Sequence, residues 1–420
     1  MQLLIRKVRI LAPGSPFQGK IRDILIMDGI IKQIGEAISD QGAQVIEAKG
    51  LYVSPGWMDV FAQFCDPGYE YREDLTSGSA AAAAGGYTAV MVIPDTLPCL
   101  QSRSEIEYIR KKASGQLVDI IPIGAVSRDL QGKALAEMYD MHQSGALAFS
   151  NGLNPIQPSG FLVKALQYIR AFDGVIIQIP EDRSISLNGL MNEGISSTRL
   201  GMPGKAAIAE ELMVRRDLEL ARYAGSRIHF TGISTSGSVD LIREAKRQGI
   251  RVTASVTPYH LLLTDNLLEN YDAHLKVTPP LRSLEDTMAL RKALQEGVLD
   301  CIATHHLPQD KDSKAVEFEY AGEGMIGLET SFGILNQVLD QMPLEERVAL
   351  LSVHPRQVFG LPVPQIAENE PANLTIFNPD TSWIFQKEDI HSRSSNTPFI
   401  GHSMTGKVKA VVNHGQCLIF

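Results

Sequence analysis

The stretch VSPGWMDVFAQF, residues 53–64, opens the part of the chain that decides the fold. Short apolar runs of this kind, bounded by turn residues, indicate buried strands. Seven similar runs follow: YTAVMVIPDT (87–96), VDIIPIGAVS (118–127), GALAFSN (145–151), GVIIQIPE (174–181), RIHFTGIST (227–235), RVTASVTPYH (251–260) and LDCIATHH (299–306). Eight is the strand number of a (β/α)8 barrel, so the pattern favours that fold.

Amphipathic stretches lie between these runs and carry apolar residues at helical spacing. They are RSEIEYIRKKAS (103–114), ALAEMYDMHQS (134–144), LVKALQYIRAF (162–172), AAIAEELMVRRDLELARYA (206–224), SVDLIREAKRQG (238–249) and LEDTMALRKALQEG (284–297). Alternation of strands and helices produces a parallel sheet covered by helices. The sequence therefore predicts an α/β protein with a TIM-like (β/α)8 barrel over residues 54–361.

The two ends of the chain differ from the barrel in character. Strand signals without long helices appear at 3–11, 23–35 and 44–53, and again at 372–379, 383–386 and 406–420. Turn residues such as Pro13, Gly14 and Gly29 separate the first three. We expect residues 1–53 and 362–420 to combine into one small β-sandwich domain.

Composition limits the partners of this chain. The 420 residues carry a net charge of -9 without clustered Lys and Arg, which argues against binding to nucleic acid or to an anionic membrane. Cys65, Cys99, Cys301 and Cys417 form no C-x-x-C pair and are expected to be free thiols. With no signal-like segment and no apolar run of membrane-spanning length, the predicted location is the cytoplasm.

Seven motifs, taken with their order and spacing, are specific. They are SPGWMD (54–59), EDLTSGSAAAAAGGYT (73–88), LGMPGKAAIAEE (200–211), VTPYHLLLTD (256–265), PPLR (279–282), GLET (327–330) and NTPFIG (396–401). In these motifs the chain resembles the dihydroorotase family of the cyclic amidohydrolases over nearly its whole length. The resemblance implies reversible closure of carbamoyl-aspartate to dihydroorotate at one or two zinc ions. Strand-end histidines and a bridging Asp or carbamylated Lys hold these ions in the family.

Most metal-holding positions of the family fall on residues that do not bind zinc well. The two histidines of the first-strand pattern Asp-x-His-x-His fall on Phe61, which has no lone pair to donate, and Gln63, a weak amide ligand. No lysine lies near the bridging-Asp position in the sequence. The bridging-Asp position falls on Asn151. The ligand positions of the fifth, sixth and eighth strands fall on Ile179, Gly232 and His305, respectively.

The substrate-holding positions of the family are exchanged as well. The position of the family's Arg that binds the substrate carboxylate falls on Cys65. The position of the Asn in the family pattern Met-Pro-Asn-Thr falls on Asp95, whose charge would repel an anionic substrate. The Asn before Pro-Pro-Leu-Arg is Thr278, and the last histidine of the eighth-strand motif is Gln309. The ten positions together predict a vestigial pocket with no catalytic residue, no metal and no cofactor.

The remaining candidates form no alternative site. His305 and His306 are adjacent, so on a strand their side chains point to opposite faces and do not share one ion. His260 is expected to be hydrogen-bonded beneath the barrel mouth, and Cys65 has no base partner at a recognisable spacing. The charged segment 305–324 is typical of a mobile loop over the mouth. Because an empty cavity loses packing energy, we expect side chains such as Phe61 and Ile179 to fill the mouth.

Three functional hypotheses follow. The first is a non-catalytic dihydroorotase-like protein of pyrimidine biosynthesis, a homo-oligomer that assembles with aspartate transcarbamoylase, as family precedent suggests. The second is an active dihydroorotase or cyclic amidase that hydrolyses dihydroorotate to N-carbamoyl-L-aspartate with rearranged metal ligands. The third is a metal-free protein that binds a small amide through Asp95, His305 and Cys65.

Overall fold

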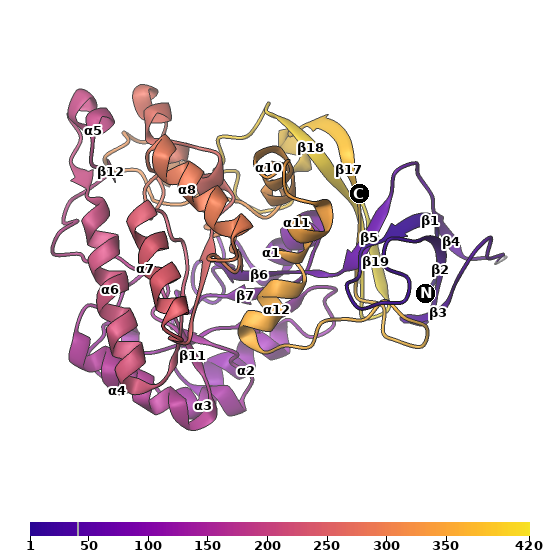
Figure 1. Cartoon of the computed structure of the whole chain (residues 1–420), viewed down its shortest axis with the longest axis horizontal. Coiled ribbons are helices and arrows are strands. Elements are labelled where there is room, and N and C mark those ends of the chain that lie inside the picture. Colours follow the sequence, from indigo (N-terminus) through magenta and orange to yellow (C-terminus); the bar gives the residue numbers. More distant parts are fainter. Residues whose placement is uncertain (40–41) are drawn as a thin grey trace.

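The computed structural model describes residues 1–39 and 42–420, and its largest part is a parallel barrel (Figure 1). Neighbouring barrel strands are parallel, and a bridge from Ala62 to His306 closes the ring. The described barrel strands are β6 (Trp57–Ala62), β7 (Tyr87–Val92), β8 (Asp119–Pro122) continued by β9 (Gly124–Ala125), β10 (Phe149–Ser150), β11 (Val175–Gln178), β14 (Arg227–Phe230), β15 (Val252–Val256) and β16 (Cys301–Ile302). The barrel predicted from the sequence is confirmed.

Helices surround the barrel strands (Figure 1). The longer ones are α1 (Leu75–Ala84), α2 (Arg103–Lys112), α4 (Ser159–Ile169), α6 (Ala207–Ala224), α7 (Ser236–Arg247), α8 (Leu284–Gln295) and α10 (Ser331–Val338). The shorter ones are α3 (Met138–Gln143), α5 (Ile195–Leu200), α9 (Lys311–Lys314), α11 (Leu344–Ala349) and α12 (Val353–Phe359). In α7 the Thr235 hydroxyl caps the first turn, and Val239, Ile242 and Ala245 form the buried stripe. Such a stripe at helical spacing packs a helix onto the barrel.

Strands from both chain ends form the β-rich domain beside the barrel (Figure 1). Hydrogen bonds join its strands in the order β19-β18-β17-β5-β1-β2-β3, with β4 paired to β1. The strands are β1 (Gln2–Ile10), β2 (Ile21–Met27), β3 (Ile30–Gly35), β4 (Gln44–Ile46), β5 (Tyr52–Pro55), β17 (Leu374–Ile384), β18 (Ser403–Asn413) and β19 (Gln416–Ile419). The two ends meet where β5 pairs antiparallel with β17, so the predicted domain built from both termini is confirmed.

Part of the inside of the barrel is apolar. Met58, Phe61, Met91, Ile177 and Ala303 belong to one buried cluster within it. In a parallel barrel all strands end at the same face, and the loops that follow them surround a single mouth. Two short strands, β12 (Met191–Asn192) and β13 (Gly204–Lys205), pair within these loops. Within the described residues, no helix is both long enough and apolar enough to cross a bilayer.

Candidate functional site

Four predicted site residues meet at the centre of the barrel mouth. Phe61 at the end of β6 and Ile179 after β11 are buried in the same apolar cluster. The ring of His305 lies 4.7 Å from the ring of Phe61, centroid to centroid. On the other side, a Cβ atom placed on Gly232 would lie 2.7 Å from Cε1 of His305. The His305 ring therefore occupies the space that a side chain at Gly232 would need.

Little volume remains beside Ile179. Beside Ile179 and Thr278 there is a cavity of about 10 Å³. One water molecule needs roughly 10–15 Å³ by this kind of measure. The contacts of the His305 ring with Phe61 and with the space beside Gly232 are consistent with the filling that the sequence predicts for Phe61 and Ile179.

His305 is tied into a buried chain of polar groups. Its Nε2 lies 2.8 Å from Thr231 Oγ1, which accepts a hydrogen bond of 2.9 Å from Ser255 Oγ. Ser255 Oγ in turn lies 3.0 Å from Nε2 of His229. Burial lowers the pKa of His305 and that of His229 to about 3, so both rings are neutral at physiological pH. This series of hydrogen bonds holds the rings of His305 and His229 inside the barrel wall.

Gln63, Asp95 and Asn151 lie at the rim and are held by local hydrogen bonds. Gln63 Nε2 donates to the backbone oxygen of Asp95 over 3.0 Å, and the Asp95 carboxylate accepts the Leu153 N–H over 3.1 Å. Asn151 Oδ1 accepts the Ser127 N–H over 3.0 Å. Burial raises the pKa of Asp95 to about 7. At neutral pH this side chain is partly protonated, so it repels an anion less than a fully ionised carboxylate does.

Cys65 is buried below the rim. Burial, assisted by the negative charge of Glu73, raises the pKa of its thiol to about 12. Because the thiolate is the nucleophile, a thiol with this pKa is inert at physiological pH. This environment argues against a cysteine hydrolase.

A lysine from a distant segment reaches the mouth, although the sequence interpretation noted none near Asn151. Lys205 Nζ lies 3.1 Å from Glu323 Oε1, 3.4 Å from Glu181 Oε1 and 3.0 Å from Thr278 Oγ1. Thr278 also donates to Glu323. Gln309 Nε2 donates to the Glu323 backbone oxygen over 2.8 Å. We call Lys205, Glu181, Glu323 and Thr278 the mouth cluster.

The mouth cluster was not predicted, although Lys205 stood in a motif that the sequence made conspicuous. LGMPGKAA is part of one of the seven family motifs, but no role at the mouth was predicted for its lysine. The useful signal was a single lysine before a helix, with glutamates at 181 and 323 following two other strands of the barrel. The loops that follow barrel strands share one face, so opposite charges in them can pair.

A cavity of about 230 Å³ lies at the mouth cluster. Leu153, Glu181, Arg183, Lys205, Thr278, Leu307 and Glu323 are among its lining residues, whereas Phe61 and His305 are not. A molecule in this cavity would therefore contact the ion pairs of the mouth cluster and remain outside the filled centre.

His306 and His260 have structural contacts. His306 Nε2 lies 3.3 Å from Glu73 Oε2, and its Nδ1 accepts the Gly327 N–H, so it points away from the partners of His305. His260 Nε2 lies 3.1 Å from the carbonyl oxygens of Pro279 and Pro280. The predicted divergence of His305 and His306 and the predicted hydrogen-bonded burial of His260 are confirmed.

The residues at the mouth do not fit a bound zinc ion. A structural zinc site takes four protein ligands and a catalytic site three. Phe61, Ile179 and Gly232 offer no ligand atom in their side chains. Throughout residues 1–39 and 42–420 there is no group of three or more His, Cys, Asp or Glu side chains placed to hold a metal ion.

Comparisons with known proteins agree with this fold. An L-hydantoinase (dihydropyrimidinase) from Arthrobacter aurescens superposes with a TM-score of 0.85 at 25% identity, covering 99% of this chain and 96% of that one. A D-hydantoinase superposes with a TM-score of 0.83 at 22% identity, over 100% and 95% of the two chains. An amidohydrolase family model matches residues 209–418. The fold is that of the amidohydrolase barrels.

Comparisons of sequence identify the family of this chain more specifically than the comparisons of structure do. A model described as dihydro-orotase-like matches residues 50–238. A protein named dihydroorotase from Syntrophus aciditrophicus is 39% identical over 99% of both chains. Another of that name, from Pelotomaculum thermopropionicum, is 40% identical over 100% of this chain and 99% of its own. The chain belongs to the dihydroorotase family.

Proposed function

We propose that this chain is a non-catalytic member of the dihydroorotase family, a homo-oligomer that supports aspartate transcarbamoylase by assembling with it. One observation carries the non-catalytic part: Phe61, Ile179 and His305 are packed together where the strand ends of the barrel meet. A hydrolase of this fold needs space there for an activated water and a scissile amide. The partner is suggested by the resemblance to dihydroorotase-like subunits that lack metal ligands.

The neutral state of two mouth residues, His305 and Cys65, supports the same proposal. His305, with a pKa of about 3, is hydrogen-bonded to Thr231, and Cys65, with a pKa of about 12, stays protonated. A general base works best with a pKa near the operating pH, and a thiol nucleophile must ionise. His305 does not meet the requirement for a general base, and Cys65 does not meet that for a thiol nucleophile.

The test of this proposal measures activity, metal content and partner together. The purified full chain is expected to show no turnover of dihydroorotate in either direction, with less zinc than one equivalent after dialysis. When the chain and aspartate transcarbamoylase of the same cell are expressed together, they are expected to elute as one complex. Turnover of dihydroorotate that scales with added zinc would contradict the non-catalytic role, and separate elution would contradict the partnership.

An active dihydroorotase is the competing function, and the names of the full-length relatives favour it. This function requires the mouth to rearrange so that metal-binding side chains from outside its centre approach one ion. Activity that a chelator removes and zinc restores would support it. The third function, binding of a small amide, is expected from the sequence at Asp95, His305 and Cys65, which do not line the mouth cavity; a small amide in that cavity would meet Arg183 and Glu323 instead. A thermal-shift screen with small amides and hydantoins tests it.

A further inference from the structure

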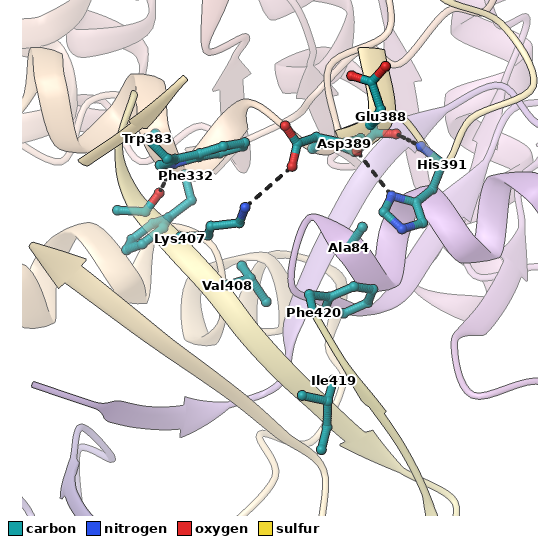
Figure 2. Close-up of a pocket in the computed structure, with 13 residues that line it drawn as sticks. Ala84, Phe332, Trp383, Glu388, Asp389, His391, Lys407, Val408, Ile419 and Phe420 are labelled. Carbon is teal, nitrogen blue, oxygen red and sulfur yellow. Dashed lines mark hydrogen bonds and ion pairs between the residues drawn. The ribbon is translucent and has the colours of Figure 1, made fainter. Parts of the chain in front are cut away.

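A second cavity, of about 260 Å³, lies away from the mouth, between the barrel and the β-rich domain. Figure 2 shows its labelled lining residues: Phe332 comes from α10, Trp383 from β17, Lys407 from β18, and Phe420 follows β19. Asp389 and His391 come from the segment between β17 and β18. Aromatic rings and charged groups therefore face the same small volume.

One cation of the chain already uses this environment. Lys407 Nζ lies 4.3 Å from the centroid of the Trp383 ring and 3.3 Å from Asp389 Oδ1 (Figure 2). An ammonium group over an indole face is attracted by the ring electrons, and the carboxylate adds charge pairing. The pairing also neutralises Lys407, so the cavity presents no free positive charge to an anion.

Glu329 is left with an unused oxygen at the cavity wall. Only 8% of this residue is exposed. Its Oε1 accepts the N–H groups of His391 and Ser392 over 3.1 and 3.2 Å, while its Oε2 has no hydrogen-bond or ion-pair partner among the described residues. Burial raises the pKa of Glu329, because desolvation penalises its charged form and outweighs the opposing influence of His306 and of the backbone N–H groups. A buried carboxylate in this state gains most from a positively charged partner.

We propose that this cavity binds a small organic cation, an alkylammonium or alkylguanidinium. Its head donates hydrogen bonds to Glu329 Oε2, and its carbon chain packs against Phe332 and Phe420. The exposed Glu388 at the wall adds negative charge that attracts the ligand. Small-molecule sites usually measure about 300–1,000 Å³, so a cavity of about 260 Å³ suits a short unbranched chain. This binding does not depend on whether the barrel is catalytic.

The test is calorimetric titration of the full chain with n-butylammonium chloride at constant ionic strength. n-Butanol, which has nearly the same shape and no charge, is the ligand control. Saturable binding of the cation with much weaker binding of the alcohol is expected. No saturable binding up to the solubility limit of the salt, or equal affinity for the two compounds, would overturn the proposal.

Two variants locate the binding. Glu329→Gln keeps a side-chain oxygen that accepts the N–H groups of His391 and Ser392 but removes the negative charge. It is expected to lower the affinity for the cation at least about tenfold. Glu345→Gln removes an exposed charge at the start of α11 and is expected to leave the affinity unchanged. Ala84→Leu fills the cavity from the end of α1, leaves every carboxylate in place and is expected to abolish binding. If Glu329→Gln does not fold, unchanged affinity in Ala84→Leu alone contradicts the site.

Discussion

The imidazole of His305 fills the space beside Gly232, where an added Cβ atom would lie only 2.7 Å from its Cε1. Gly232 also has a φ of +70°, a conformation that favours glycine. Conformation and crowding therefore both oppose a side chain at this position. Restoring a histidine there would require His305 to move first.

Gly232→Ala is expected to destabilise the protein by about 2–4 kcal/mol, of which about 1 is the left-handed backbone and about 1–3 is the overpacking against His305. Urea unfolding measures the change. Gly297→Ala is the matched control, because Gly297 has a φ of +68° with no atom within 4 Å of its added Cβ, so it reports the backbone cost alone. Equal losses in the two variants would show that His305 does not crowd Gly232. Adding His305→Ala to Gly232→Ala should recover part of the loss through non-additivity.

Cys65 is expected to resist alkylation in the folded protein. With a pKa of about 12, roughly one thiol in ten thousand is ionised at pH 8. Cys417 is less buried and has a pKa of about 11, so it should react with iodoacetamide before Cys65 does. Peptide mapping by mass spectrometry follows both residues, and urea-unfolded protein gives the intrinsic rates. Faster modification of Cys65 than of Cys417 in folded protein would restore the case for a reactive thiol.

The sequence predicted the barrel because the evidence for each strand is local. An apolar run of four to eight residues with a turn after it is readable without knowing its neighbours, and the ends of such runs locate the mouth. The resemblance to the dihydroorotase family then assigned Phe61, Ile179, Gly232 and His305 to one site at this mouth. Local evidence also sufficed for the termini, where strand signals in both segments suggested one domain.

The contacts of these side chains could not be predicted in the same way, because their partners are distant in sequence. Lys205 and Glu323 are separated by 118 positions and Glu73 and His306 by 233, so no local pattern links them. The pKa of Asp95 depends on how much water the fold excludes, which composition does not reveal. The sequence therefore identified which chemical groups are missing from the mouth, whereas the cluster that replaces them required the structure.

Lys205 is expected to stabilise the barrel mouth. Lys205→Met leaves Glu181 and Glu323 without their shared cation, and removing one partner of a buried ion pair is strongly destabilising. Because the Glu323 side chain is 36% exposed, we expect a smaller loss, about 2 kcal/mol. Arg199→Met, which breaks an exposed pair with Glu269, is the control and should cost less than about 1 kcal/mol. Chemical denaturation measures both. If Lys205→Met/Glu323→Gln is no more stable than Lys205→Met, the pair contributes nothing.

Asp95 is expected to make stability depend on pH. Folding raises the pKa of Asp95 from 3.8 to about 7, so the folded state binds this proton more tightly than the unfolded state. The stabilisation from that proton is fully present below about pH 4 and is lost as the pH rises to about 7. Asp95→Asn mimics the protonated side chain and still accepts the Leu153 N–H.

Asp95→Asn should therefore match the stability of the wild type at pH 4 and exceed it at pH 8 by about 1–3 kcal/mol. This range is smaller than the free energy that corresponds to the whole pKa shift, because the Asp95 side chain is only partly buried by surface area. Urea unfolding at several pH values gives the difference directly. Asp380→Asn, at an exposed position, controls for the loss of one negative charge and should show no such trend. A difference between Asp95→Asn and wild type that is constant with pH, or that grows as the pH falls, would mean that Asp95 is ionised and well solvated at the barrel mouth.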